Sequence, residues 1–288
     1  MFTVVIPLYN KELSIKNTIK SVLNQTCQDF EIVVVNDGST DNSVKMVKSI
    51  KDNRIRLIQQ KNQGVSAARN RGIKEASYDW IAFLDADDLW EVNHLEEINK
   101  MMALFPDEKI YVTSFEYSDG RVMFKHKRQT PIFKIEKYFQ EALKENIIWT
   151  SIVVVNKYCF SKVGGFNTVL TNGEDLELWA RLAREWGIVK SSATTATYRK
   201  DAENRTSLNR KVEKTHVYHF NLDDLPVSDE KIYYKHLILA RLYDYCRALD
   251  FNCFIKLKNK HSQLSYIEVT IYIFSHLKKR LKQKMLNF

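Results

Sequence analysis

The chain has 288 residues, of which 44% are hydrophobic. This length and apolar fraction predict one large domain with a sizeable core plus an appendage, and they exclude global disorder. The eight glycines and four prolines exclude collagen-like and proline-rich chains. No run without a charged residue is longer than 11 residues, the length of 146–156, which is too short to span a membrane.

The net charge of +9 is unevenly distributed. Residues 251–288 carry eight Lys or Arg against a single acid, Glu268, which makes +7 and leaves +2 for the other 250 residues. We interpret this as a basic C-terminal tail rather than a basic protein.

The four cysteines form no CxxC pair, and the opening MFTVVIPLYNK has neither the basic region nor the cleavage site of a secretory leader. Both features predict a cytoplasmic protein with reduced thiols.

The first 90 residues alternate short apolar runs with helical patterns. Strands are predicted at 3–8, 31–36, 55–60 and 80–84, and helices at 13–24, 41–50 and 66–76. Val- and Ile-rich runs separated by helices are typical of βαβ units, in which helices cover both faces of a parallel sheet.

The next part of the chain predicts a mixed, more antiparallel half. Its expected elements are a helix from Trp90 to about 104, a hairpin of 111–117 and 122–124 around Asp119-Gly120, a strand at 150–155, a helix at 174–186 and a strand at 188–198. The polar stretch NLDDLPV at 221–227 marks the expected boundary between a domain at 1–220 and a helical region at 221–288. That region is expected to hold a helix at 229–249 and a second helical segment to the end.

Polar and acidic residues follow the predicted parallel strands, which end in PLYN (7–10), NDGS (36–39), NQG (62–64) and DADD (85–88). Ligands of open α/β sheets bind at the carboxyl ends of the strands. Three carboxylates there, Asp37, Asp85 and Asp87, would repel one another unless a divalent metal or a bound ligand relieved the repulsion.

The Asp85-x-Asp87 pair has two interpretations. Two carboxylates at alternate positions after a strand can approach one ion, and oxygen ligands favour Mg²⁺ or Mn²⁺. Alternatively, Asp87 or Asp88 caps the helix that follows Trp90. The position after the apolar run WIAFL, among the other polar strand ends, favours the metal.

Other sites for phosphate or metal lack their motifs. The sequence has no GxxxxGK[ST], no GxGxxG after a strand, and no HExxH or Cys/His cluster. These absences argue against P-loop NTPases, dinucleotide dehydrogenases and zinc enzymes.

Five segments, in order, resemble the family 2 glycosyltransferases, which are inverting enzymes with the GT-A fold. They read VVIPLYNKE (4–12), EIVVVNDGSTDNS (31–43), NQGVSAARNRGI (62–73), FLDADDLW (83–90) and VGGFNTVLTNGEDLELWARL (163–182). The resemblance covers about residues 1–210 and implies the GT-A (nucleotide-diphospho-sugar transferase) fold. We therefore expect a mixed, mainly parallel central sheet with helices on both faces, plus the C-terminal helical appendage.

The resemblance also implies a nucleotide-sugar site at the matching residues. That site comprises Pro7, Tyr9, Glu12, Asp37, Gly64, Arg69, Asp85 and Ala86. Tyr9 would pack beside the base, and Asp37 would accept a hydrogen bond from the uracil N–H. Gly64 and Arg69 would lie near the ribose and the diphosphate, and Asp85 would contact the ribose or the donor sugar.

The catalytic groups are implied in the same way. Asp87 would bind a Mn²⁺ or Mg²⁺ ion that bridges both phosphates, and Asp175 would be the base, with Glu174 beside it. A looser match, TYRKDAENRTS, resembles the segment that closes over the donor phosphates, where Arg199 or Arg205 would supply charge.

Several of these residues also have a structural explanation, and Tyr9 could be ordinary packing. Asp37 could begin the NDGST turn, and Gly64 could serve a left-handed turn. Arg69 could be a solvated helix residue, and the acidic pair at 174–175 would favour a helix dipole whatever its chemistry. Trp179, at helical spacing, is predicted to be core.

The predicted reaction is direct displacement of a nucleotide diphosphate by an acceptor hydroxyl, which inverts the anomeric centre. The expected donor is a UDP-sugar and the expected acceptor is a glycan or a lipid-linked glycan. The alternatives are a sugar nucleotidyltransferase, which has no need of Asp175, and a non-catalytic nucleotide-sugar-binding subunit.

The basic tail has one apolar helical face, formed by Ile267, Ile271, Phe274, Leu277, Leu281, Met285 and Phe288. Lys278, Lys279, Lys282 and Lys284 flank or oppose it. Such a helix is predicted to lie on the anionic inner face of the cell membrane, or to dock on the catalytic domain or a partner. Nucleic acid is not an expected partner, because no binding motif accompanies the basic cluster.

Overall fold

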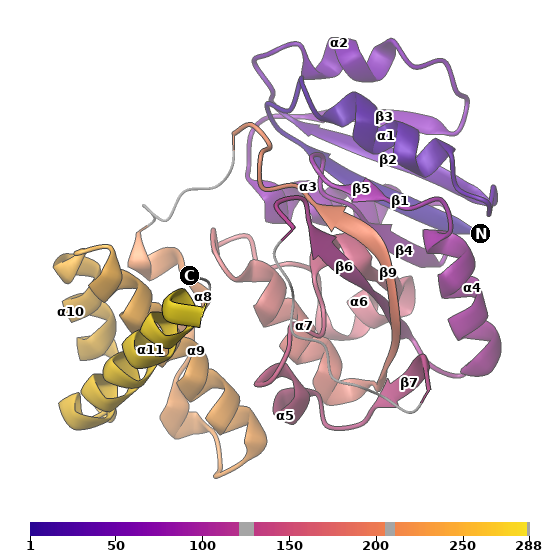
Figure 1. Ribbon diagram of the computed structural model, residues 1–288. Coiled ribbons are helices and arrows are strands. Elements are labelled where there is room, and N and C mark those ends of the chain that lie inside the picture. The colour runs from indigo at the N-terminus through magenta and orange to yellow at the C-terminus, as the bar shows by residue number, and fades with distance from the viewer. Residues whose placement is uncertain (121–129, 205–210, 287–288) are drawn as a thin grey trace. The chain divides into compact units, whose positions relative to one another are not determined.

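A computed structural model describes residues 1–120, 130–204 and 211–286. The chain divides into two compact units, Met1–Leu208 and Asn209–Phe288 (Figure 1).

The first half of the larger unit is a parallel sheet. Its strands are β1 (Phe2–Leu8), β2 (Phe30–Asp37), β3 (Ile55–Gln60) and β4 (Trp80–Phe83), in the order β3-β2-β1-β4. The connecting helices are α1 (Ile15–Leu23), α2 (Ser43–Lys48) and α3 (Val65–Glu75). The predicted βαβ units are thus confirmed, with boundaries shifted by a few residues at most.

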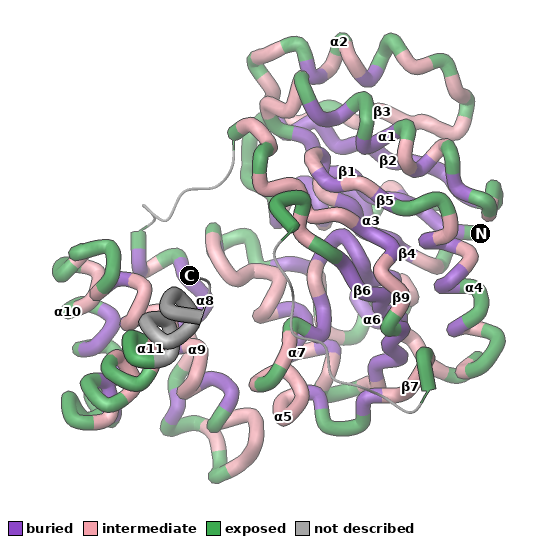
Figure 2. Tube along the Cα trace, viewed as in Figure 1, coloured by how far each residue is buried: buried purple, intermediate pink, exposed green. Residues whose placement is uncertain are grey.

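Alternate residues of β2 pack on opposite faces of this sheet. Ile32 and Val34 join the main core, whereas Val33 and Val35 pack against Ala68 of α3. At Gly72 of α3, an added Cβ atom would lie 2.2 Å from the Val5 side chain, so only glycine permits this close approach. The strands of this sheet are therefore largely buried, whereas the helices have an exposed outer side (Figure 2).

The second half of the sheet is mixed. β8 (Val153–Asn156) runs antiparallel to β4, and β6 (Ile110–Tyr117) pairs antiparallel with β8 and parallel with β9 (Ile188–Tyr198). The short strands β5 (Leu89–Trp90) and β7 (Ile132–Ile135) both pair antiparallel with β9. The helices here are α4 (His94–Leu104), α5 (Tyr138–Ala142), α6 (Lys157–Val163) and α7 (Glu174–Glu185).

Two predicted elements differ. The predicted partner strand at 122–124 lies outside the described residues, and β6 is a central strand between β8 and β9. The predicted strand at 150–155 begins as a 3-10 turn, η1 (Thr150–Ile152). The prediction missed β5 and β7 because such short strands show no hydrophobic period.

The smaller unit is helical. It contains α8 (His216–His219), α9 (Asp229–Arg247), α10 (Phe251–Lys260) and α11 (Tyr266–Leu286), with 3-10 turns η2 (Val212–Lys214) and η3 (Leu222–Asp224). The predicted last helical segment is therefore two helices. Within the described residues, no helix is long and apolar enough to cross a membrane.

The division between the units falls before residue 209 and not at the predicted 220/221. The segment in between packs with the helices. The His216 ring stands edge-on to Tyr234 of α9 at 5.3 Å, and the Val217 carbonyl lies 2.7 Å from Nε2 of His261. These contacts place residues 212–219 in the helical unit.

Candidate active site

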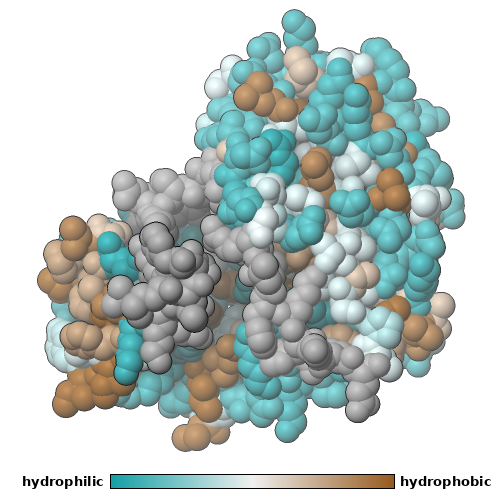
Figure 3. All heavy atoms as spheres, viewed as in Figure 1, coloured by the Kyte–Doolittle hydropathy of each residue, from teal (hydrophilic) through white to brown (hydrophobic). Residues whose placement is uncertain are grey.

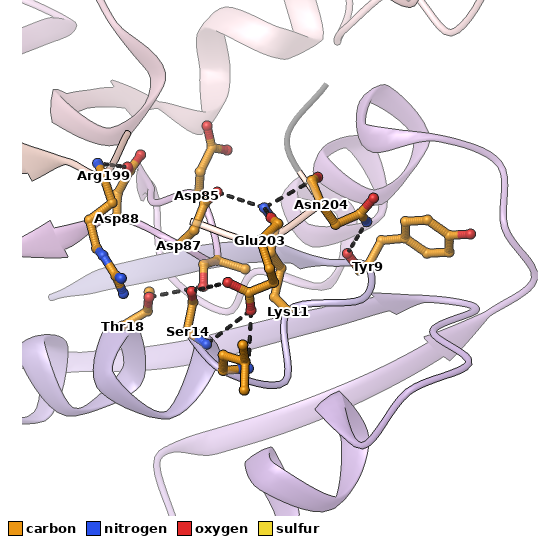
Figure 4. Close-up of polar contacts among 12 residues, drawn as sticks. Tyr9, Lys11, Ser14, Thr18, Asp85, Asp87, Asp88, Arg199, Glu203 and Asn204 are labelled. Atoms are coloured by element: carbon orange, nitrogen blue, oxygen red, sulfur yellow. Dashed lines mark hydrogen bonds and ion pairs between the residues drawn. The ribbon is translucent and has the colours of Figure 1, made fainter. Parts of the chain in front are cut away.

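The predicted site residues lie at the carboxyl ends of β1, β2 and β4, at the start of α3 and within it, and at the start of α7, all in the larger unit. Figure 4 shows the part around Lys11 and Asp87.

Two loops, after β1 and after β2, are tied to each other. The Asn10 side-chain oxygen accepts the Thr40 N–H at 2.8 Å, and Glu12 Oε2 accepts the Asn42 N–H at 2.8 Å. The Glu12 carboxylate thus joins the loops. Tyr9 is 41% exposed on the first of them, whereas Pro7 is buried within β1.

The buried carboxylate of Asp37 holds the loop that joins β3 to α3. One oxygen accepts from Gln60 Nε2 at 2.7 Å and the Gln63 N–H at 2.9 Å, and the other accepts the Gly64 N–H at 2.8 Å. Gly64 has a φ of +90°, which favours glycine. The chain's own N–H groups therefore already neutralise part of the charge at this strand end.

Arg69 of α3 is buried, with 4% of its surface exposed. Its guanidinium lies 2.7 Å from Asp85 Oδ1 and 3.2 Å from Glu174 Oε1, and it also lies over the Phe166 ring. Although burial opposes the charge, the carboxylates of Asp85 and Glu174 raise the pKa of Arg69 above its usual value. The interpretation of Arg69 as a solvated helix residue is therefore wrong.

Glu174 and Asp175 open α7, after Gly173 in the left-handed region. Asp175 Oδ1 accepts the Leu176 N–H at 2.8 Å. Burial, together with the neighbouring Glu174 charge, raises the pKa of Asp175 to about 6, against the opposing effect of Arg69. A carboxylate with such a pKa holds a proton more readily than an ordinary aspartate near neutral pH.

Asp87 is paired with Lys11. The Lys11 ammonium lies 2.6 Å from Asp87 Oδ2, and it also donates to the backbone carbonyls of Glu203 at 2.5 Å and Asn204 at 3.4 Å (Figure 4). Burial raises the pKa of Asp87, and the nearby Asp85 adds to the rise while Lys11 opposes it. The predicted repulsion among the carboxylates is thus partly relieved by Lys11 and Arg69.

Asp88, next in the sequence after the Asp85-x-Asp87 pair, is fully buried. Its carboxylate accepts the Ser151 hydroxyl at 2.6 Å and the Arg199 N–H at 3.1 Å, and burial raises its pKa well above the usual value. The helix that follows begins at His94 with Asn93 as its N-cap, so helix capping by Asp87 or Asp88 is wrong.

The remaining predicted residues have local partners. Ala86 is buried, and its carbonyl accepts the Thr18 hydroxyl of α1 at 3.0 Å. The Arg199 guanidinium pairs with Asp201 at 2.9 Å, and Arg205 lies outside the described residues. Trp179 is buried against Phe83 and Phe166, as predicted for a core residue.

Sequence reasoning missed Lys11 and Glu203. The Glu203 carboxylate accepts the backbone N–H groups of Leu13 and Ser14 at 3.0 and 3.1 Å and the Ser14 hydroxyl at 2.5 Å. No local pattern links this residue to a loop some 190 positions earlier in the chain. Its burial opposes ionisation, but these bonds prevail and lower the pKa of Glu203.

The donor set at Asp87 fits a divalent ion of the kind that substrate phosphates help to bind. Among the described residues, no group of three or more acidic, His or Cys side chains surrounds one point. Mg²⁺ nevertheless is often held by one or two carboxylates plus substrate phosphates. That Asp87 already holds the cation of Lys11 at 2.6 Å shows that this carboxylate suits a positive charge.

A family model described as "Glycosyl transferase family 2" matches residues 3–164, more than half of the chain. The chain belongs to glycosyl transferase family 2. The family predicted from the sequence is thereby confirmed.

Several relatives of this family 2 chain are named glycosyltransferases, the enzyme class predicted from the sequence. It is 36% identical over 124 residues to glycosyltransferase GlyA of Streptococcus pneumoniae, and this match covers 42% of this chain and 18% of the relative. It is 47% identical over 88 residues to the uncharacterized glycosyltransferase YibD of Escherichia coli, covering 30% and 26%. The chain therefore spans well under half the length of these relatives.

Solved structures of S. aureus TarS share the fold. TarS 1–349 in complex with UDP-GlcNAc matches with a TM-score of 0.60 at 19% identity, covering 92% of this chain and 73% of that one. The complex with UDP matches with a TM-score of 0.60 at 17% identity, covering 92% of both chains. The predicted GT-A fold is confirmed.

Proposed function

We propose that this family 2 chain is an inverting glycosyltransferase that moves a sugar from a UDP-sugar to a glycan or a lipid-linked glycan. The observation that carries the proposal is the link made by Arg69. It joins Asp85, at the strand end expected to contact the donor, to Glu174, the neighbour of the expected base. The donor-side and acceptor-side carboxylates thus share one buried guanidinium.

The donor class is supported by the position of Asp37 and by the ligands of solved structures that share this fold. Asp37 and Gly64 lie together at one strand end, and Tyr9 presents an exposed ring from the adjacent loop. TarS, which shares the fold, has been crystallised with UDP-GlcNAc and with UDP. We assign a uridine diphosphate sugar as the donor on this basis.

Asp87 would hold a divalent ion, Mg²⁺ or Mn²⁺. When bound, such an ion supplies positive charge that stabilises the diphosphate leaving group. The chain's own contribution is to keep Asp87 in place. Asp88, next to it, is anchored by Ser151 and the Arg199 N–H.

Asp175 is the proposed base that takes the proton of the acceptor hydroxyl. Its raised pKa of about 6 brings its basicity closer to the working pH than that of an ordinary aspartate. The Arg69 guanidinium, 3.2 Å from Glu174 Oε1, holds the neighbouring carboxylate in place. Attack from the side opposite the diphosphate inverts the anomeric centre.

A sugar nucleotidyltransferase would have no need of an acidic pair at the start of α7. The raised pKa of Asp175, caused by desolvation and by Glu174, and the link of Glu174 to Asp85 through Arg69 favour glycosyl transfer. A non-catalytic binding subunit would likewise have no use for a proton acceptor there.

A panel of nucleotide diphosphate sugars, screened by thermal shift with and without Mn²⁺, tests the donor assignment. We expect one uridine-linked donor to raise the melting temperature in proportion to ln(1 + [L]/Kd), and more so with Mn²⁺. Stabilisation by an adenine- or guanine-linked donor alone would contradict the uridine assignment.

The C-terminal helix supports a peripheral membrane location. Of its predicted apolar face, Ile267, Ile271 and Phe274 are 72%, 64% and 67% exposed, while the buried Val269 faces the rest of its unit. Figure 3 shows hydrophobic side chains gathered at the surface of this unit. An exposed apolar helix face followed by a sequence with five Lys or Arg at 278–284 suits an anionic bilayer.

A further inference from the structure

The ammonium of Lys11 is the meeting point of three segments of the larger unit. Its side chain is 12% exposed, and that of Asp87 is 14% exposed. One partner is the Asp87 carboxylate after β4, and the others are the backbone carbonyls of Glu203 and Asn204 after β9 (Figure 4). Asp87 is the one of the three partners with a formal negative charge, so it balances the ammonium.

The backbone holds Lys11 in this place. Its N–H donates to the Ser43 hydroxyl at 2.7 Å, and its carbonyl accepts the N–H groups of Ser14 and Ile15 at the start of α1. The 203–204 segment is fastened to the same loop by the Glu203 carboxylate and by Asn204 Nδ2, which donates to the Tyr9 carbonyl at 3.3 Å. The ammonium is therefore presented to Asp87 by a braced loop, and its partners are not those of a solvated lysine.

An ammonium and a divalent ion compete for one carboxylate. Two positive charges at one partly buried carboxylate repel each other, so each weakens the binding of the other unless a further anion is present. A nucleotide diphosphate is such an anion. It would bring negative oxygens for the ion and for the displaced ammonium at the same time.

We propose that Lys11 is a resident cation that occupies Asp87 in the donor-free protein, opposes divalent-ion binding there, and turns to the diphosphate when the donor binds. Ion and nucleotide diphosphate then bind cooperatively, because each removes the obstacle to the other. This inference rests on the proposed function, since it takes Asp87 as the site of the ion.

The test measures Mn²⁺ affinity without nucleotide, by electron paramagnetic resonance of the free ion. The variants are Lys11→Met, which removes the cation, and Lys11→Gln, which also removes it but keeps an N–H donor for the 203–204 carbonyls. Lys16→Met is the matched control, because Lys16 is exposed on α1, and Asp87→Asn removes the proposed ligand.

We expect Lys11→Met and Lys11→Gln to bind Mn²⁺ about tenfold more tightly than the unchanged protein, equivalent to about 1.4 kcal/mol. Lys16→Met should match the unchanged protein, and Asp87→Asn combined with Lys11→Gln should lose the gain. In a second titration, without metal, both Lys11 variants should bind UDP about fivefold more weakly than Lys16→Met.

Unchanged Mn²⁺ affinity in both Lys11 variants, with binding still lost in Asp87→Asn, would overturn the resident-cation inference and leave the metal assignment standing. Mn²⁺ affinity that is indifferent to Asp87→Asn would overturn the metal assignment of the proposed function and the inference with it. A gain in Mn²⁺ affinity without weaker UDP binding would overturn the transfer of Lys11 to the diphosphate.

Discussion

Arg69 lies between Asp85 and Glu174, 2.7 Å from the first carboxylate and 3.2 Å from the second, with 4% of its side chain exposed. Asp85 follows β4 and Glu174 opens α7, so one buried guanidinium joins the two parts of the sequence expected to bind the donor and to activate the acceptor. Its Nε has no hydrogen-bond partner among the described residues, so the two carboxylates and the face of the Phe166 ring are its main partners.

Replacement of Arg69 by Met should strongly destabilise the larger unit. The variant leaves the partly buried Asp85 and Glu174 without their counter-charge, and loss of one partner of a buried ion pair costs about 3–5 kcal/mol. Urea unfolding measures the change. Arg71→Met, on the same helix with a 43% exposed side chain paired to Glu75, should cost less than about 1 kcal/mol. Equal effects of the two substitutions would contradict the role given to Arg69.

The transfer rate should depend on pH through Asp175. The base must be ionised, so kcat/KM should fall about tenfold per pH unit below a pH of about 6, the raised pKa of Asp175. A profile that stays flat down to pH 4.5 would argue against Asp175 as the base.

The same raised pKa has a consequence for stability. Between the ordinary aspartate pKa and about 6, the folded protein binds more protons at Asp175 than the unfolded chain does. Stability contributed by this group is therefore fully present below the unfolded pKa and is lost as the pH rises through 6. Unfolding of Asp175→Asn should lack this component, and unfolding curves of both proteins at pH 4.5 and 7 measure it.

Glu203→Gln should loosen the contact between the 203–204 segment and the loop at residues 11–14. The substitution removes the charge from a carboxylate that accepts from the Leu13 and Ser14 N–H groups, at a cost of about 1 kcal/mol in unfolding free energy. Because the pKa of Glu203 is lowered in the folded protein, this stabilisation is present above the unfolded pKa and is lost as the pH falls. Asp201→Asn is the control, an exposed carboxylate of the same segment whose removal should hardly change unfolding.

Vesicle binding should depend on the exposed face of α11. Replacement of both Ile271 and Phe274 by Glu changes exposed positions, so the helical unit should still fold, but binding to vesicles rich in anionic phospholipid should fall at least about tenfold. Replacement of Ser262 and Gln263 by Glu adds the same charge at exposed positions outside α11 and should reduce binding much less. If both double variants lost vesicle binding equally, the binding would depend on net charge and not on the apolar face of α11.

The sequence predicted the parallel half well because β1 and β2 are buried along their whole length and read as apolar runs between helices. It also located the acidic residues that follow the strands, because parallel strands bring their carboxyl ends to one edge of the sheet. The partners of these acids could not be predicted from the sequence. Arg69 meets Glu174 across 105 positions, and Lys11 meets Glu203 across 192, so no local pattern carries them.

Boundaries were predicted less well where the chain is irregular. The stretch NLDDLPV is polar, but α8 before it and η3 within it both pack on α9, so the compact helical unit begins earlier than composition predicted. The short strands β5 and β7 form by pairing with β9, and a segment of two to four residues has no pattern that predicts such a tertiary contact.

The most direct test of the account compares Asp175→Asn with the unchanged protein in two measurements on the same preparation, UDP binding by calorimetry and sugar transfer from the UDP-sugar selected by the thermal-shift panel. We predict UDP affinity within about twofold of the unchanged protein and a transfer rate at least about 100-fold lower, because the variant loses only the proton acceptor. Glu177→Gln, in the same first turn of α7 but paired with Arg181, should retain both properties. Full transfer by Asp175→Asn, or no binding of UDP to the unchanged protein, would contradict the proposed glycosyl transfer.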